Sequence, residues 1–233
     1  MNSIITGATK GIGRALAFKF AAEGHNLAVC SRNIDDLNHL KSDIHNFYPN
    51  IEIFTSVVDI SKKDEVQRFA QEVIAHFTTI DVLINNGGIF IPGEISKEAD
   101  GALEQMMDTN LYSAYHLTRA ILPAMTQSQK AHIFNMCSIA SFTAYPNGGS
   151  YSISKFALLG FTKVLRAELK TQGVRVTAVM PGATWSDSWK GADFPEDRLM
   201  DASDIAACIW SAYSLNAKAV VEEIVIRPQL GDL

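Results

Sequence analysis

The sequence predicts an α/β protein in which about seven parallel strands form one doubly wound sheet flanked by helices. Short β-branched runs alternate with longer amphipathic segments along the whole chain, a pattern typical of β-α-β units. Most of these runs are almost continuously apolar, as expected of parallel strands covered on both faces. No repeat, low-complexity tract or Pro/Gly/Ser-rich linker divides the 233 residues, so we expect a single domain over residues 1–233.

Seven short segments are expected to form the strands, because each is rich in apolar or β-branched residues and is followed by polar or turn residues. In chain order they are residues 3–6, 27–31, 51–58, 82–85, 132–137, 174–180 and 220–226.

The segments between the strands show helical periodicity. Ile12, Leu16 and Phe20 form one apolar stripe, and Val66 and Phe69 begin another. Helices are expected at residues 12–23, 34–47, 62–77, 99–128, 151–172 and 203–215. Residues 183–199 are the least regular part and are expected to form a mobile flap over a substrate; they include Trp185, Trp189 and Phe194.

Composition excludes several classes of protein. With 47% hydrophobic residues the chain can bury a substantial core, which excludes disorder. Its 20 basic and 25 acidic residues give a net charge of -5, and without a dense basic run nucleic acid is not an expected partner. No apolar stretch reaches the length of a membrane helix, so no membrane partner is expected. The three cysteines, Cys30, Cys137 and Cys208, are far apart in the sequence, which is typical of free thiols in a reducing compartment, so a cytoplasmic protein is expected.

A glycine-rich turn follows the first expected strand and leads into the first helix. It reads Thr6-Gly7-Ala8-Thr9-Lys10-Gly11-Ile12-Gly13, with the spacing GxxxGxG instead of the strict GxGxxG. Glycines let the backbone approach a pyrophosphate closely, and the N–H groups of a helix start attract negative charge. The turn therefore predicts a phosphate-binding site, although a plain connecting turn is the alternative.

The end of the second expected strand bears on which dinucleotide is bound. Ser31 and Arg32 stand where an acidic side chain would hold the ribose of NAD, and a guanidinium favours the 2′-phosphate of NADP. Lys10 would add a second cation, unless it is an ordinary surface charge. Asp35 and Asp36 could instead bind a ribose hydroxyl, but they fall inside the next expected helix. We therefore expect NADP as the cofactor, with NADPH preferred over NADH.

Tyr151 and Lys155 are four residues apart at the start of an expected helix and so share one face. A nearby ammonium stabilises a phenolate, which would lower the pKa of Tyr151 and make it a usable acid and base. Ser138 ends the fifth expected strand, where its hydroxyl could bind a substrate carbonyl oxygen. An incidental surface pair and a turn-capping serine are the alternatives.

Taken together, these motifs resemble those of the short-chain dehydrogenase/reductase family, in the same order and through nearly the whole chain. The resemblance rests on the glycine turn, Asn85-Asn86-Gly87-Gly88, Asn110, Ser138, Tyr151-x-x-x-Lys155 and Pro181-Gly182.

The resemblance implies a Rossmann-type domain with a Ser, Tyr and Lys catalytic set. Tyr151 would exchange the proton, Lys155 would lower its pKa and hold the nicotinamide ribose, Ser138 would position the carbonyl, and Asn110 would anchor a water-linked proton path. No metal is implied.

The resemblance also implies a set of cofactor-binding residues. Asp59 and the adjacent Ile60 would lie at the adenine, and Pro181, Gly182 and Thr184 would frame the nicotinamide. The remaining cofactor residues are Gly7, Thr9, Lys10, Gly11, Ile12, Gly13, Ser31, Arg32, Asn86 and Gly87, with Tyr151 and Lys155 shared.

Two positions depart from the family pattern. Gly87 replaces the usual Ala of Asn-Asn-Ala-Gly, and Ser141 replaces a common Gly three residues after the Ser. Neither removes a reacting group, but both are expected to alter loop flexibility near the cofactor.

The expected activity is reversible hydride transfer between NADP(H) and a small carbonyl or secondary alcohol, with Tyr151 as acid and base. The alternatives are a 3-oxoacyl-carrier-protein reductase, a catalytically idle NADP-binding regulator and, less favoured, a nucleotide-sugar lyase or epimerase. The substrate is expected to be an apolar acyl, aromatic or alicyclic ketone, because apolar side chains lie near the expected cleft in sequence: Phe142, Tyr145, Met180 and the flap aromatics. The alternative is that these side chains pack the flap onto the body of the protein.

The resemblance implies a homodimer or homotetramer formed through the helices at 99–128 and 151–172. The apolar residues on these helices are compatible with a subunit contact and equally with the core; they include Leu111, Leu117, Phe161 and Leu165.

Overall fold

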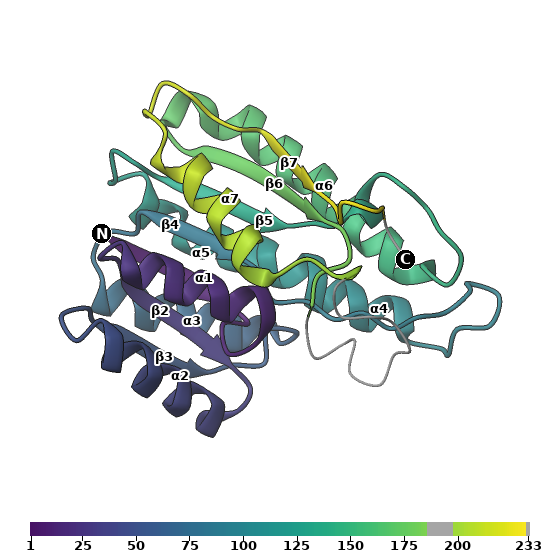
Figure 1. The fold of residues 1–233 in the computed structure, drawn as a ribbon, viewed down its shortest axis with the longest axis horizontal. Coiled ribbons are helices and arrows are strands. Elements are labelled where there is room, and N and C mark those ends of the chain that lie inside the picture. The colour runs from purple at the N-terminus through teal and green to yellow at the C-terminus, as the bar shows by residue number, and fades with distance from the viewer. Residues whose placement is uncertain (186–197, 232–233) are drawn as a thin grey trace.

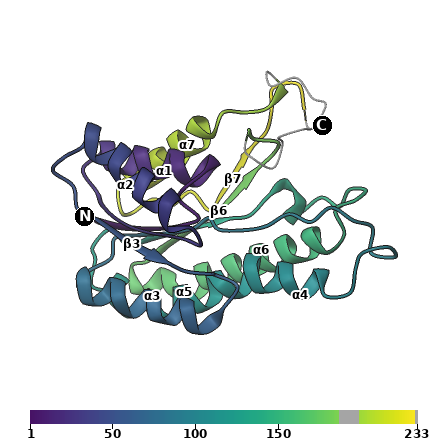
Figure 2. The same ribbon diagram turned by 90° about the horizontal axis from the view of Figure 1, so that it is seen from below.

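The computed structural model describes residues 1–185 and 198–231. Seven parallel strands form one sheet in the order β3-β2-β1-β4-β5-β6-β7, with helices on both faces (Figures 1 and 2). The strands are β1 Asn2–Thr6, β2 Asn26–Ser31, β3 Ile53–Val57, β4 Val82–Asn85, β5 His132–Met136, β6 Arg175–Pro181 and β7 Glu223–Ile226. The expected doubly wound α/β fold is confirmed, although β3 and β7 are shorter than the apolar runs that predicted them.

The helices divide between the two faces of the sheet. The principal helices are α1 Gly11–Ala22, α2 Ile34–Phe47, α3 Lys63–His76, α4 Ala102–Met107, α5 Ser113–Met125, α6 Gly149–Leu169 and α7 Ala202–Ser214. Figure 2 shows α1, α2 and α7 on one face and α3, α4, α5 and α6 on the other. Because both faces are covered, the strands are apolar at nearly every position.

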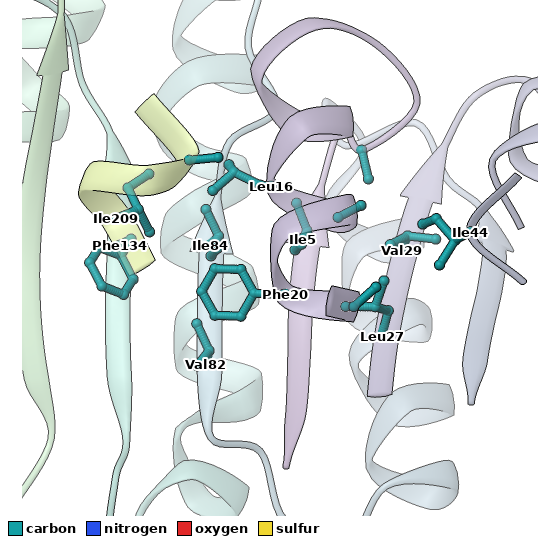
Figure 3. Packing of buried hydrophobic residues seen from close by; sticks show 14 of the residues in the cluster. Ile5, Leu16, Phe20, Leu27, Val29, Ile44, Val82, Ile84, Phe134 and Ile209 are labelled. Carbon is teal, nitrogen blue, oxygen red and sulfur yellow. The ribbon is translucent and has the colours of Figure 1, made fainter. Parts of the chain in front are cut away.

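Alternate residues of each strand belong to opposite cores. Ile5, Leu27 and Ile84 point to the face covered by α1 and α7, where Phe20 and Ile209 meet them (Figure 3). Their chain neighbours on the same strands belong to the second core, under α3 and α5. This period of two is what an extended strand imposes.

The helix expected at 99–128 is not regular. A π-helical turn, Asp108–Tyr112, separates α4 from α5. The backbone remains helical through the turn, so the apolar period that predicted one helix is preserved on both sides of the extra residue. Such π turns occur frequently at functional sites, and this one carries Asn110.

The strand order reverses between β1 and β4. From β1 the chain moves outward to β2 and β3, then returns to the other side of β1 and continues outward to β7. In open α/β sheets ligands bind beyond the carboxyl ends of the strands at such a reversal.

Candidate active site at the carboxyl edge of the sheet

The glycine-rich turn connects the carboxyl end of β1 to α1. Gly7 has a φ of 63° and Gly11 a φ of 50°, conformations that favour glycine. A Cβ on Gly13 would overlap the carbonyl group of Gly7 and lie 2.6 Å from Asn86 Nδ2. These three glycines are therefore required by the shape of the turn.

The start of α1 is suited to an anion. The first helical N–H groups have no partner within the helix, and among the described residues no side chain caps them. The first turn contains no acidic residue, so the positive end of the helix dipole is not neutralised there.

Asn86 connects this turn to the end of β4. Its side-chain amide donates to the carbonyl oxygens of Thr6 at 2.9 Å and Gly7 at 3.1 Å. The N–H groups of Asn86 and Gly87 both donate to Thr6 Oγ1. These contacts restrain the backbone at Gly87, where a change in flexibility was expected, and Ile60 Cδ1 occupies the space that an Ala Cβ would need.

Polar and charged groups gather beyond the ends of β2 and β3. Thr9 Oγ1 donates to Ser31 Oγ at 3.4 Å, and Arg32 is exposed. Lys10 Nζ lies 3.8 Å from a carboxylate oxygen of Asp36, so a cation and an anion share this corner. Asp59 Oδ1 accepts two hydrogen bonds from Ser61, at 3.0 Å from its N–H and 2.8 Å from its hydroxyl.

Tyr151, Ser138 and Lys155 lie close together beyond β5. The Ser138 side chain lies near the Tyr151 phenol and acts to lower its pKa. Lys155 is 6% exposed, and its Nζ donates to the Met136 carbonyl oxygen at 2.7 Å and lies 5.7 Å from the centre of the Tyr151 ring. The amine therefore points into the protein.

The pKa of Tyr151 shifts in the direction opposite to the one expected from the sequence. Burial raises the pKa of Tyr151, and the Ser138 side chain opposes that rise without cancelling it. Burial lowers the pKa of Lys155 to about 8. Loss of hydration is the largest effect on the phenol, and a lowering of its pKa by the Lys155 ammonium stays a prediction.

Asn110 is placed beside this group by the π turn. Its Oδ1 accepts from the Ile89 N–H at 2.8 Å, and its Nδ2 donates to the Ile89 carbonyl oxygen and to Ser154 Oγ. Ser154 Oγ in turn donates to the Tyr151 carbonyl oxygen at 2.7 Å. Asn110 thus connects the segment after β4 to the helix that carries Tyr151.

The segment after β6 closes another side of the site. The Gly182 N–H donates to the Ile226 carbonyl oxygen at 2.8 Å, and Thr184 Oγ1 donates to the Gly182 carbonyl oxygen at 3.0 Å. Trp185 and Met200 are joined by a backbone hydrogen bond across the expected flap. Trp189 and Phe194 lie outside the described residues.

Two contacts at the site were not anticipated from the sequence. Phe90 packs its ring edge-on against Tyr151 at 4.8 Å between centroids. Ser141 Oγ accepts from the Ser138 N–H, and Ser138 Oγ accepts from the Ala140 N–H. The Ser141 side chain therefore adds a hydrogen bond that restrains this turn. The Ser-x-x-Ser spacing resembles a capping box, so the sequence contained a signal for the contact of Ser138 with Ser141. No sequence pattern indicated that Phe90 would contact Tyr151.

The described part of the chain lacks two kinds of feature. It contains no cluster of three or more His, Cys, Asp or Glu side chains suited to a metal ion. Within residues 1–185 and 198–231, no helix is long and apolar enough to cross a membrane.

The sheet order and the glycine-rich turn define a Rossmann-type dinucleotide-binding fold. The chain belongs to the short-chain dehydrogenase/reductase family, since the short chain dehydrogenase family profile matches residues 2–195. It is accordingly an oxidoreductase that acts on CH–OH groups.

Individual relatives agree with this assignment. Sepiapterin reductase of Chlorobaculum tepidum is 34% identical over 99% of this chain and 97% of its own. A 3-oxoacyl-[acyl-carrier-protein] reductase of Staphylococcus epidermidis is 31% identical over 86% of this chain and 82% of its own.

Solved structures show the same architecture. An alcohol dehydrogenase of the archaeon Thermococcus sibiricus, complexed with 5-hydroxy-NADP, superposes with a TM-score of 0.90 at 25% identity, over 98% of this chain and 96% of that one. A metagenomic short-chain oxidoreductase in complex with NADP gives a TM-score of 0.85 at 27% identity, over 98% and 97%.

Proposed function

We propose that this enzyme transfers a hydride between NADP(H) and a small carbonyl or secondary alcohol, with Tyr151 as the acid and base. The observation that carries the proposal is the gathering of Tyr151, Ser138 and the buried Lys155 at the edge where the glycine-rich turn also opens, with Lys155 Nζ 5.7 Å from the centre of the Tyr151 ring. A catalytically idle binding protein would not require this arrangement.

Each side chain of the set has a task that its contacts allow. In the reductive direction Tyr151 donates its phenolic proton to the substrate oxygen as negative charge develops there. Ser138 Oγ already accepts from the Ala140 N–H, which leaves its own hydrogen to donate to the same substrate oxygen. Lys155 balances the phenolate that remains, and Asn110 holds the backbone on both sides of the site.

The residues at the carboxyl edge fit a nicotinamide dinucleotide. The pyrophosphate would lie on Gly11, Ile12 and Gly13 at the uncapped start of α1. The adenine end would lie near Asp59 and Ile60, and the nicotinamide end near Lys155 and the segment Pro181, Gly182 and Thr184. When bound, the nicotinamide supplies or accepts the hydride.

We infer a preference for NADPH from the corner beyond β2. Arg32 is exposed there, Lys10 of the glycine turn lies beside Asp36, and Thr9 and Ser31 add hydroxyls. A 2′-phosphate offers these cations a doubly charged partner. That two similar structures were solved with NADP or a derivative of it supports the preference.

The substrate is expected to be apolar and small. Phe90, Phe142 and Tyr145 are each more than one-third exposed and lie close to Tyr151 along the chain or in contact with it. Met180, also expected at the cleft, is buried in the core. The two named relatives reduce unlike substrates, so their names favour neither class.

A carrier-protein partner is less well supported. Of the basic residues that would attract it, Lys97 pairs with Glu94 and Lys163 pairs with Glu223 at 3.0 Å. Arg119 donates to the Tyr115 hydroxyl, and Lys130 precedes β5, at the opposite edge of the sheet from the site.

We also infer one domain and a homodimer or homotetramer in a cytoplasmic setting. Leu117 and Leu165 belong to the core, so they do not serve a subunit contact. The candidates for a subunit contact are instead the exposed apolar residues on α5 and α6, namely Tyr115, Phe156 and Val164. Sedimentation velocity would give the oligomeric state.

The central test replaces Tyr151 by Phe. Tyr151→Phe removes the proton donor and retains the ring, so kcat for carbonyl reduction should fall by about 10²- to 10⁴-fold while NADPH binding persists. Turnover would be followed by NADPH oxidation over a panel of ketones, and NADPH binding by fluorescence titration. Tyr112→Phe, at an exposed position on the π turn, is the control; near-normal turnover by Tyr151→Phe would contradict the proposal.

A further inference from the structure

Glu98 lies at the amino end of α6, the helix that carries Tyr151 and Lys155. Its Oε1 accepts from the Ser150 N–H at 2.8 Å, and its Oε2 accepts a short hydrogen bond from the Ser150 hydroxyl. Both carboxylate oxygens are therefore bound to the residue immediately before Tyr151, although Glu98 is 52 residues away in the sequence.

The backbone around Glu98 is shaped to admit its carboxylate. A Cβ on Gly93 would lie 2.6 Å from Glu98 Cγ, and a Cβ on Gly149 would overlap Glu98 Oε1. The Gly93 N–H donates to the Asn147 carbonyl oxygen at 3.0 Å, which joins the loop between β4 and α4 to the loop before α6. Both loops extend beyond the carboxyl edge of the sheet, at the right of Figure 1.

A carboxylate at this place has two physical effects. It satisfies a backbone N–H group at the helix start, and its negative charge complements the positive end of the α6 dipole. The loop it holds also contains Tyr145, whose carbonyl oxygen accepts from the Gly148 N–H at 3.0 Å. The first turn of α6 thus depends on Glu98 from outside the helix, while Ser154 and Asn110 hold it on the other side.

We propose that Glu98 is a positioning residue for Tyr151: by binding both polar groups of Ser150, it fixes the first turn of α6 and hence the place of the phenolic oxygen. This inference rests on the proposed role of Tyr151. Glu98 acts through Ser150, so its loss should move the proton donor without removing any cofactor contact. Misplacement by about 1 Å can cost about 10²-fold in rate.

The first experiment compares three variants of the full-length enzyme. Glu98→Ala should lower kcat by about 10- to 100-fold while the Kd for NADPH changes by less than about twofold. Glu98→Gln should recover most of the rate, because its amide oxygen still accepts the Ser150 N–H. Glu94→Gln is the matched control, since Glu94 lies in the same loop and pairs with Lys97 at the surface.

A second measurement reads the position of the helix without turnover. Amide hydrogen exchange over residues 148–155 should accelerate in Glu98→Ala and remain at the wild-type rate in Glu94→Gln. Unchanged exchange in Glu98→Ala would overturn the inference even if no tested ketone is turned over. A fall in kcat accompanied by an equal loss of NADPH affinity would also overturn it, since the defect would then be general.

Tyr151→Phe separates the two possible failures. If Tyr151→Phe is inactive and Glu98→Ala turns over like wild type, the positioning role is wrong and the proposed function stands. If Tyr151→Phe is itself active, the proposed function fails, and Glu98 has no proton donor to position.

Discussion

At the scale of single residues, the corner beyond β2 contains groups that act against each other. Arg32 and Lys10 would attract a 2′-phosphate, whereas the Asp36 carboxylate, 3.8 Å from Lys10 Nζ, would repel it. On the proposed assignment, the balance between these charges should set the preference between NADPH and NADH.

We expect Arg32→Ala and Asp36→Asn to shift the preference between NADPH and NADH in opposite directions. Arg32→Ala should weaken NADPH by about 1–3 kcal/mol and NADH by much less, because only NADPH offers the phosphate. Asp36→Asn should tighten NADPH relative to NADH. Fluorescence titration of both cofactors measures this, with Asp35→Asn as the control. Equal losses for both cofactors in Arg32→Ala would contradict the assignment.

For single residues, the sequence predicts which side chains can react better than it predicts which groups they contact. The spacing of Tyr151 and Lys155 places both on one helix face, as found, but the direction of the tyrosine pKa depends on burial, which no spacing reveals. Likewise Asn86 reads as a cofactor residue, yet its amide is used to join Thr6 and Gly7.

At the scale of elements, two glycines show how packing decides the effect of one substitution. Gly13 lies in the first turn of α1, where a Cβ would overlap the Gly7 carbonyl oxygen. Gly160 lies on the exposed face of α6, where a Cβ meets nothing within 4 Å.

Alanine should therefore have opposite effects at the two sites. Gly13→Ala should destabilise the fold by at least about 2 kcal/mol and abolish cofactor binding, because backbone must shift. Gly160→Ala should stabilise it by up to about 1 kcal/mol, through helix propensity. Urea unfolding of both variants gives the two free energies, and a stable, cofactor-binding Gly13→Ala would show that the turn can relax.

Element types follow from the sequence because strand and helix periods differ, and the seven strands could be placed within a few residues. The π turn could not be foreseen. One extra residue in a helix leaves the apolar pattern readable on both sides, and the feature that requires it, the contact of Asn110 with Ile89 and Ser154, is long-range.

At the scale of the whole molecule, two buried histidines lie near the amino edge of the sheet. Burial, with the nearby N-terminus and opposed by Asp81, lowers the pKa of His25 to about 4. Burial and the Arg175 charge lower the pKa of His132 well below its usual value. Phe20, Trp210 and Tyr213 pack around His25.

Stability should consequently fall in mild acid. Between pH 6.5 and about 4 the unfolded chain binds a proton that folded His25 excludes, so the free energy of unfolding decreases by up to about 1.4 kcal/mol per pH unit from this histidine. The lowered pKa of His132 acts in the same direction. Above pH 6.5 this dependence disappears.

The variant His25→Phe should reduce that slope. It keeps the aromatic packing and loses the hydrogen bond with Ser3, so it should be less stable at neutral pH and less sensitive to acid. Urea unfolding at several pH values tests this, with the exposed His39→Gln as the control. An identical slope in wild type and His25→Phe would exclude His25 as a source.

The reversal of strand order at β1 and β4 has an evolutionary consequence. On the proposed roles, the determinants of cofactor choice lie mainly before residue 61, and those of the carbonyl partner lie mainly after residue 88. A gene crossover in β4 between two family members should then yield hybrids that inherit NADPH or NADH use from one parent and ketone selectivity from the other. Selection can adjust either trait while leaving the other unchanged.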